Sequence, residues 1–284
     1  MINTFLKYKT KFLINHEIKK KDLDNSKKIL FALFTRYGDT IIDIAVIKEF
    51  VQKYPDKDYL FLCPRQMKPY FDELLPGMNC ISINKRNLID MFRVHFFLKN
   101  WKPNIGFNPW SNGLDSCYFL TYCDKYLCYK NFKKPQKINH YQVVRDYLRL
   151  PKKDWFIKSL KLRHDYKKIL ICPQSTDQDR TMNDSLLNSI ISNSFKKYHG
   201  VDITIAKMSD KIFPENCKKF IFKKNAESSR KFISLVKESD LIICTDSAPF
   251  HISIALRKDT LLYLKNTVPK VVINSGSNLA LEGF

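Results

Sequence analysis

The sequence predicts an α/β protein made of two Rossmann-like domains whose parallel sheets face one another across a cleft. Short apolar runs, typical of buried strands, alternate with segments whose apolar residues recur at helical spacing. This alternation occurs twice, with a polar and charged stretch at 152–166 between the two blocks. We therefore expect a basic N-terminal segment at 1–27, a first domain at 28–155 and a second domain at 156–284.

The first block opens with a buried strand, after which helices and strands alternate. Strands are predicted at 28–34, 58–63, 79–83 and 103–107. Helices are predicted from Asp39 onward, at 87–99 and at 139–150. The helix at 87–99 carries five large side chains on one face: Leu88, Met91, Phe92, His95 and Phe96. The aromatic region 110–129 is compatible with a further helix.

The second block repeats the pattern. Strands are predicted at 168–172, 201–206, 218–222, 240–244, 260–264 and 270–273. Helices are predicted at 185–198 and 228–239, and a loop followed by a helix is predicted from Thr245 to Leu256. In open α/β sheets, ligands bind at the carboxyl ends of the strands. The loops that follow 28–34, 168–172 and 240–244 are therefore where we expect the site.

The formal net charge of +21 has two explanations that the sequence leaves open. A strongly basic surface attracts anionic partners such as phosphorylated substrates or acidic lipids. The chain also has thirty-nine Lys against ten Arg, the bias that an AT-rich coding sequence produces without a functional reason. No helix-turn-helix, RNP motif or zinc finger is evident, so we expect no nucleic-acid partner.

The cysteines and the N-terminal segment indicate the cellular compartment in which the protein works. The eight Cys form no C-x-x-C pair and have no nearby His to complete a zinc spacing, so we expect a reducing compartment and no metal. The segment 1–27 lacks the continuous apolar core of a signal peptide. Its apolar residues lie among many Lys, so an amphipathic helix on an anionic membrane, a helix packed on the domain and a loose tail all stay open.

The first of the three loops contains Arg36, Gly38, Asp39 and Thr40. Gly38 allows a tight turn or a close approach of backbone and ligand. Asp39 falls at the predicted helix start, where its carboxylate can cap the helix. The same carboxylate, facing a cleft, can instead take a proton from a substrate hydroxyl.

The second loop, "CPQSTDQDR", offers hydrogen-bonding groups at Gln174 and Ser175, and a guanidinium at Arg180. Arginine can contact two phosphate oxygens at once, so a phosphate site and an ordinary polar surface loop both stay open.

The third loop, "CTDSAPFH", places Thr245, Asp246 and Ser247 between an apolar strand and a helix, with His251 one turn along. A helix N-terminus attracts anions, and the small residues Ser247 and Ala248 leave room for a diphosphate. The alternative is a capped core helix that contains a hydrogen-bonded His.

Two of these stretches resemble signatures of the heptosyltransferase-like glycosyltransferases of family 9. "RYGDTIIDIAVIKEFVQKYP" resembles the opening motif of that family, and "SLVKESDLIICTDSAPFHISIALRK" resembles its second signature. "ILICPQST" resembles the strand that the family ends in P-G-A-S. The similarity covers residues 28–75 and 168–275, and the middle of the chain matches weakly.

The resemblance implies the GT-B fold and an inverting, metal-independent transfer of a sugar from a nucleotide-diphosphate donor. The implied acceptor is lipopolysaccharide or a related surface glycan, which implies a cytoplasmic protein, peripheral on the inner membrane. Asp39 matches the general base of the family, with Arg36, Gly38 and Thr40 around it. The implied donor-binding residues match these positions: Gln174, Ser175, Arg180, Thr245, Asp246, Ser247 and His251.

The sequence departs from the family pattern near the donor. Ala248 replaces a Gly, Gln174 follows Pro173 in place of a Gly, and "RKDTLLYLKN" replaces the segment after the last signature. These departures leave open the identity of the sugar. They also leave open a catalytically degenerate protein that binds glycan or nucleotide on the same fold.

Overall fold

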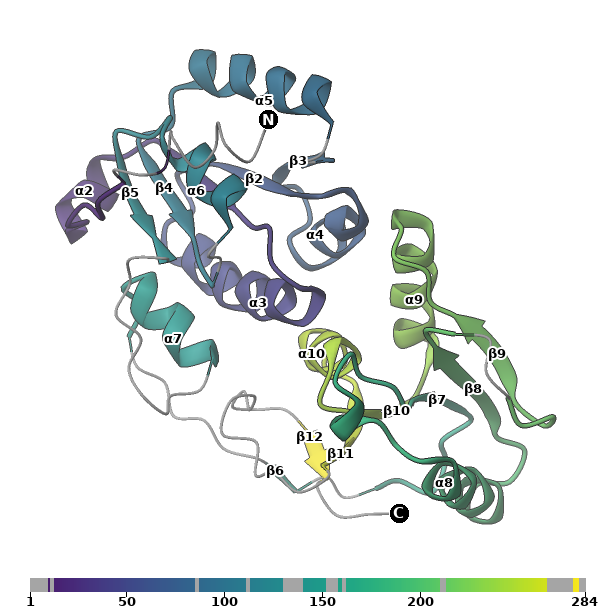
Figure 1. Ribbon diagram of the computed structural model, residues 1–284. Coiled ribbons are helices and arrows are strands. Elements are labelled where there is room, and N and C mark those ends of the chain that lie inside the picture. The colour runs from purple at the N-terminus through teal and green to yellow at the C-terminus, as the bar shows by residue number, and fades with distance from the viewer. Residues whose placement is uncertain are drawn as a thin grey trace. The chain divides into compact units, whose positions relative to one another are not determined.

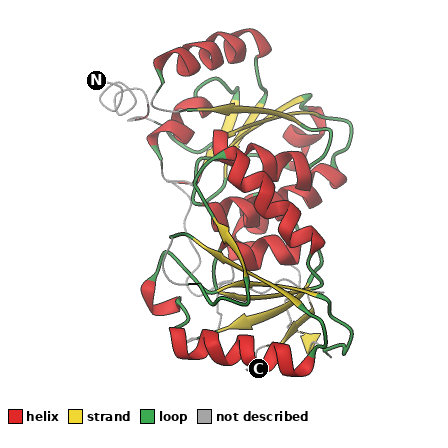
Figure 2. Ribbon diagram, turned by 90° about the vertical axis from the view of Figure 1, so that its right-hand side faces the viewer, coloured by secondary structure: helices red, strands yellow, loops and turns green. Residues whose placement is uncertain are grey.

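The computed structural model describes residues 10, 13–84, 87–110, 113–129, 140–151, 158–159, 162–209, 213–264 and 278–280. The chain forms two compact units, Met1–Lys152 and Lys153–Phe284, which are described separately. Each contains a parallel sheet with helices on both sides of the strands (Figure 1, Figure 2). The predicted α/β class with two parallel sheets is confirmed.

The sheet of the first unit has the strand order β3-β2-β1-β4-β5, with all pairs parallel. Its strands are β1 (Lys28–Ala32), β2 (Asp58–Pro64), β3 (Asn79–Ile83), β4 (Ile105–Asn108) and β5 (Lys125–Cys128). Its helices are α2 (Lys20–Asn25), α3 (Tyr37–Lys53), η1 (Arg65–Met67), α4 (Lys68–Leu74), α5 (Leu88–Trp101), α6 (Leu114–Leu120) and α7 (His140–Tyr147). The region 110–129 thus contains α6 and also β5, a strand that the sequence analysis missed.

One face of this sheet is covered by α3 through a stack of aromatic rings. The register pairs Phe31 with Phe61 and with Phe107, so the three rings lie side by side on one face. The Phe31 ring centroid lies 5.3 Å from that of Phe61 and 5.4 Å from that of Phe107. Phe50 of α3 meets Phe107 edge-on at 5.7 Å. Because successive strand residues point to opposite faces, this packing fixes which side of β1 faces α3.

The other face of the sheet is covered by α5, but with a different side of the helix than predicted. Met91 and Leu98 are buried against β1 and β2. Leu88, Phe92 and Phe96, which were predicted to share a face with Met91, are 54%, 60% and 61% exposed. Helical spacing alone groups residues into rows, and it does not say which of two neighbouring apolar rows turns toward the sheet.

The sheet of the second unit has the strand order β6-β12-β11-β10-β7-β8-β9. Its strands are β6 (Lys158–Ser159), β7 (Lys168–Cys172), β8 (Asp202–Lys207), β9 (Lys218–Ile221), β10 (Leu241–Thr245), β11 (Asp259–Tyr263) and β12 (Asn278–Ala280). Its helices are η3 (Gln178–Arg180), α8 (Asp184–Lys197), α9 (Ala226–Glu238) and α10 (Ala248–Ala255). The predicted linker at 152–166 therefore includes a strand, β6, which pairs with β12. The strand predicted at 270–273 lies outside the described residues.

The core of the second unit lies between its sheet and α8. Ile169, Ile171 and Ile243 of the central strands are buried against Leu187 and Ile190 of the helix. The central strands β7 and β10 are neighbours, with Cys172 opposite Cys244 at their carboxyl ends. The loops that leave these two strands therefore begin side by side.

Candidate active site

The loop after β1 brings Asp39 to the carboxyl end of the first sheet. Arg36, with extended backbone, is the N-cap of α3, and the Thr40 N–H donates to its carbonyl over 2.9 Å. Asp39 is thus in the first helical turn and not at the cap, where it was predicted. The Thr40 hydroxyl, which is buried, hydrogen-bonds that of Thr35 over 2.6 Å. This bond ties the loop to the helix and fixes where Asp39 emerges.

The tight turn that Gly38 was predicted to allow is not made at this residue. It lies inside the first turn of α3 and is not among the described glycines with positive φ, which are Gly77 and Gly200. The chain therefore makes no left-handed turn at Gly38. The turn between β1 and α3 is made by the residues before Arg36 in ordinary backbone conformations.

His140 lies between two carboxyl groups that α3 presents one turn apart. Its Nδ1 lies 3.6 Å from Oδ1 of Asp39, and its Nε2 lies 3.9 Å from Oδ1 of Asp43. His140 is the first residue of α7, and it is 2% exposed because α7 packs on α3. Asp39 keeps 30% of its side chain exposed, whereas that of Asp43 is fully buried. Solvent and ligands thus reach this group of three through Asp39.

The Trp110 ring, with the Tyr129 ring beside it, packs against the imidazole from the side of β4 and β5. The Trp110 ring stacks on His140 with centroids 3.4 Å apart and planes inclined by 27°. Trp110 follows β4 with a φ of 55°, a left-handed conformation that is strained for a bulky residue and is found mostly at functional sites. The Tyr129 ring, just after β5, lies 5.3 Å from that of Trp110. The imidazole plane is therefore fixed by packing.

Asp43 is an unusual residue for the interior of a helix. Neither of its carboxyl oxygens has a hydrogen-bond partner among the described residues. Burial raises the pKa of the Asp43 carboxyl well above its usual range, and the nearby charge of Asp39 raises it further. Desolvation favours the uncharged form of an acid, so burial favours the protonated form of Asp43.

In the second unit, Arg180 joins the two predicted donor loops. Its Nη1 donates to the carbonyl and to Oδ2 of Asp246, each over 3.2 Å, and its Nε donates to Oδ2 of Asp177 over 3.2 Å. Arg180 lies in η3 after β7, and Asp246 follows β10. Since β7 and β10 are neighbours, the loops that follow them meet at the carboxyl ends of the strands, where α/β sheets bind ligands. The guanidinium remains 44% exposed.

The remaining polar residues of these loops hold the loops in shape. The Gln174 side chain accepts a hydrogen bond from the Met208 N–H over 2.7 Å, after β8. The Ser175 N–H donates to Oγ1 of Thr181 over 3.1 Å. Ser247 is the N-cap of α10, and its hydroxyl lies 3.3 Å from that of Thr245 rather than bonding the helix N–H groups. The first-turn N–H groups of α10 are therefore not capped by Ser247.

The Arg180 guanidinium opposes the effect of burial on the pKa of Asp246 and adds to the effect of burial on the pKa of His251. Burial raises the pKa of Asp246, and the Arg180 guanidinium opposes that rise. Burial and, to a smaller extent, the positive charge of Arg180 together lower the pKa of His251 to about 3. His251 is therefore neutral at pH 7, so Arg180 is the cation of this loop cluster.

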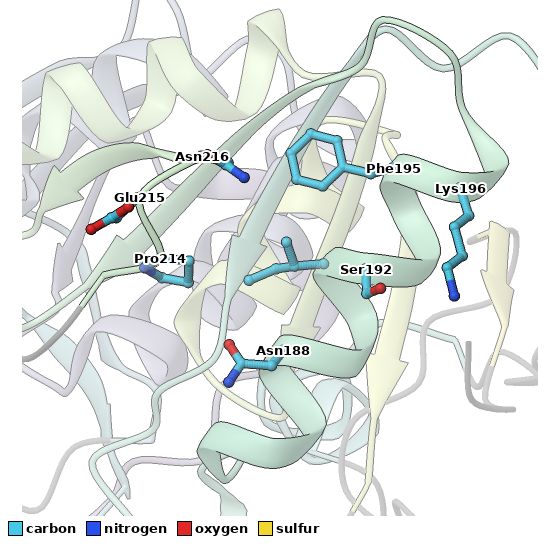
Figure 3. A pocket seen from close by; sticks show the side chains of 8 residues that line it. Asn188, Ser192, Phe195, Lys196, Pro214, Glu215 and Asn216 are labelled. Atoms are coloured by element: carbon cyan, nitrogen blue, oxygen red, sulfur yellow. The ribbon is translucent and has the colours of Figure 1, made fainter.

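A separate hollow of about 430 Å³ lies on the second unit between α8 and the segment that precedes β9 (Figure 3). Residues that line it include Asn188, Phe195 and Asn216. It contains none of the residues predicted to act in the site. Within the described ranges, His, Cys, Asp and Glu side chains form no group of three or more that could hold a metal ion. None of the described helices is both long enough and apolar enough to span a membrane.

Asp43, Trp110 and His140 are the residues of this site that the sequence analysis missed. Asp43 repeats Asp39 four residues later, on a helix whose other core positions are apolar, and that spacing was a usable signal. His140 lies about a hundred residues from Asp39 in a stretch that matches no motif. Only the packing of α7 on α3 brings it to the carboxylates.

No protein-family model and no curated protein matches this chain. Solved structures do. The glycosyl transferase family 9 protein of Veillonella parvula DSM 2008 aligns with 92% of this chain and 86% of its own, at a TM-score of 0.67 and 11% identity. The ADP-heptose lps heptosyltransferase II of E. coli aligns with 89% of this chain and 90% of its own, at 0.67 and 12%.

The E. coli heptosyltransferase WaaC, solved with ADP, aligns with 88% of this chain and 92% of its own, at a TM-score of 0.61 and 9% identity. Each alignment spans most of both chains, so the likeness extends across both units. At identities this low, the structural similarity establishes a shared fold and does not establish a shared reaction. The chain therefore has the fold of the family 9 glycosyltransferases and heptosyltransferases, as the resemblance of its two signatures implies.

Proposed function

We propose that this protein is an inverting glycosyltransferase that moves a sugar from a nucleotide-diphosphate donor to a glycan or glycolipid acceptor. The observation that carries the proposal is where the reactive groups lie. A carboxylate (Asp39) and a cation (Arg180) both stand on loops at the carboxyl ends of central strands, in a chain with the fold of glycosyltransferases. These are the loops on which α/β sheets bind ligands.

Asp39 acts in the proposal as the general base. A hydroxyl is a poor nucleophile, so a carboxylate takes its proton as the acceptor oxygen attacks the anomeric carbon of the donor. The bond from that carbon to the phosphate oxygen breaks on the opposite face, which inverts the configuration. His140, 3.6 Å from Asp39 and clamped by Trp110, positions the carboxylate. Burial favours the uncharged form of Asp43 behind it, which limits a second charge beside Asp39.

Arg180 acts at the donor side. The nucleoside diphosphate leaves with the bonding electrons, and the charge that develops on its phosphate oxygens is stabilised by a guanidinium and by the N-terminus of α10. Asp177 and Asp246 hold Arg180 beside that helix. The proposal gives the charge-stabilising role to these groups without a metal ion, so activity should survive EDTA. The proposed location is the cytoplasmic side of a membrane that carries the acceptor.

A thermal-shift screen over ADP-, GDP-, UDP- and CMP-sugars tests the proposal. One diphosphate class should raise the melting temperature, because a ligand at about 100 times its Kd stabilises a protein by about 2.7 kcal/mol. Arg180→Ala should weaken that ligand at least tenfold, the loss of one charged hydrogen-bonding group. Arg163→Ala removes another exposed Arg of the same unit and is the matched control. A shift from the monophosphate CMP class alone, or from none, contradicts the proposal.

A second candidate is a glycan- or nucleotide-binding protein that has lost turnover. The observation in its favour is that two carboxylates already engage Arg180, so a diphosphate must compete for the guanidinium. The two candidates differ in one result. The transferase consumes donor in the presence of acceptor, whereas the binding protein is stabilised by donor and leaves it intact.

A further inference from the structure

Helix α5 covers one face of the first sheet (Figure 1), and on the side away from that sheet it carries exposed apolar side chains. Ile89 is 76% exposed, and Leu88, Phe92 and Phe96 are more than half exposed. With Phe97, these side chains account for five of the nine large apolar side chains that are exposed in the described part of the chain. We call these five residues the α5 face. Exposed apolar clusters of this kind mark interaction sites.

The exposure of the α5 face does not come from a loosely attached helix. Its opposite side is anchored to the sheet through buried Met91, Val94 and Leu98. The Asn87 side chain caps its N-terminus by accepting from the Ile89 N–H over 2.9 Å. The helix is therefore held firmly, with two turns of apolar side chains directed away from the protein.

The charges around the α5 face are basic. Arg93 and Lys99 lie on the same exposed side of the helix. The one acidic residue of α5, Asp90, is engaged by the Arg65 guanidinium over 2.8 Å and by the Asn84 N–H over 2.7 Å, so its charge is compensated. An apolar row of Phe, Leu and Ile with basic residues beside it is the chemistry that recognises an anionic lipid surface.

A second copy of the chain fits the α5 face less well. Pairing two such faces brings Arg93 and Lys99 of one copy toward those of the other, and the whole chain carries a net charge of +21. Like charges oppose that association, whereas the same charges draw the protein to anionic lipid. An anionic bilayer can contact both the apolar row, through its acyl chains, and the basic residues, through its headgroups.

We propose that the α5 face is the surface on which this protein docks to an anionic membrane. Leu88, Phe92 and Phe96 enter the boundary between headgroups and acyl chains, and Arg93 and Lys99 contact the headgroup phosphates. The inference rests on the proposed function, because a glycolipid acceptor is the reason for the protein to contact a membrane. The segment 1–27, for which a membrane helix was one of three alternatives, is not needed for this docking, and Ile18 and Leu23 in its described part are buried.

Sedimentation of the full-length protein with vesicles tests the docking, using phosphatidylcholine with and without about a third phosphatidylglycerol. The double variant Phe92→Ser/Phe96→Ser should reduce partitioning roughly tenfold for each ring, since partial burial of a Phe is worth about one decade in affinity. Phe195→Ser, which removes an exposed ring of α8, should leave partitioning unchanged. Arg93→Ala/Lys99→Ala should weaken binding to the anionic vesicles roughly fivefold per residue and leave neutral vesicles unaffected.

Equal partitioning of the double variant and its parent would overturn the docking proposal. So would a dimer in light scattering that the double variant dissociates while neither protein binds vesicles, because the face would then join two copies. The vesicles contain no donor and no acceptor, so the result is independent of transfer. Vesicle binding without a nucleotide-induced thermal shift would support the docking proposal and contradict the transferase proposal. A nucleotide-induced shift without vesicle binding would contradict the docking proposal alone.

Discussion

The buried carboxyl of Asp43 makes the stability of this protein depend on pH in a direction opposite to that of most acidic residues. The residue is fully buried, has no hydrogen-bond partner among the described residues and lies near the charge of Asp39. Its folded-state pKa is therefore raised well above the value near 3.9 of an unfolded chain. Asp43→Asn replaces the carboxyl by a neutral group of nearly the same shape.

The sign follows from linkage. A group whose pKa is raised on folding contributes stability that is fully present below its unfolded pKa and is lost as pH rises toward its folded pKa. The steepest loss is about 1.4 kcal/mol per pH unit for one proton. Between pH 5 and pH 7, Asp43 therefore removes at most about 2.7 kcal/mol from the free energy of unfolding. Asp43→Asn abolishes this loss, because an amide does not titrate.

Urea unfolding of both proteins at several pH values between 4 and 8 measures the effect. The stability of Asp43→Asn minus that of the parent should rise with pH, and the titrations of groups that do not interact with Asp43 cancel in that difference. The absolute stability of the variant at pH 5 is not the test, since the buried amide has its own desolvation cost. A difference that falls with pH would refute the reasoning, because it would mean that Asp43 is ionised and paired with a charged His140, 3.9 Å away.

Three further predictions concern packing, pH and catalysis. Gly106→Ala should destabilise the first unit by about 1–3 kcal/mol in thermal unfolding, because a Cβ there would lie 2.9 Å from a methyl of Leu120 in a filled core. Asp240→Asn should lower the free energy of unfolding at pH 7, and its difference from the parent in urea unfolding should shrink as the pH falls through the lowered pKa of Asp240. Burial of Asp240 raises its pKa, but two backbone N–H donors outweigh that and hold the pKa below its usual range. His140→Ala should lower kcat while leaving the Kd of the donor unchanged, and an equal kcat would remove the positioning role.

The strands were predictable because parallel strands buried on both faces read as continuous apolar runs. "KILFALF", "KILIC" and "DLIIC" each became a central strand. β5, β6 and β12 were not predicted because they are short and partly or wholly polar, so they lack that signal. β5 is held in its sheet by pairing with β4. β6 is held by pairing with β12, which lies far from it in sequence.

The rotation of α5 could not be predicted for a different reason. Its sequence has two apolar rows, one through Met91 and Leu98 and one through Leu88 and Phe96, and each could face a sheet. The choice depends on the shape of the surface that β1, β2 and α6 present. If the outer row binds lipid, as we propose, its apolar character reflects docking rather than core packing.

The two loops predicted to bind the donor do lie at strand ends, and their meeting follows from the pairing of β7 with β10. Sequence order does not reveal that pairing, since β8 and β9 intervene along the chain. The contact of Arg180 with Asp246, 66 residues apart, was accordingly beyond sequence reasoning. His140 shows the same limit: its role depends on a helix contact that no local pattern encodes.

The most direct test of the proposed chemistry is the rate of sugar transfer by Asp39→Asn, with the donor identified by the nucleotide screen and a glycolipid acceptor. Loss of a general base should lower kcat by about 10²- to 10⁴-fold, and the Kd of the donor should stay within twofold of the parent. Asp72→Asn, which alters an exposed carboxylate of α4, is the control and should keep full activity. Transfer by Asp39→Asn at the parental rate would contradict the account.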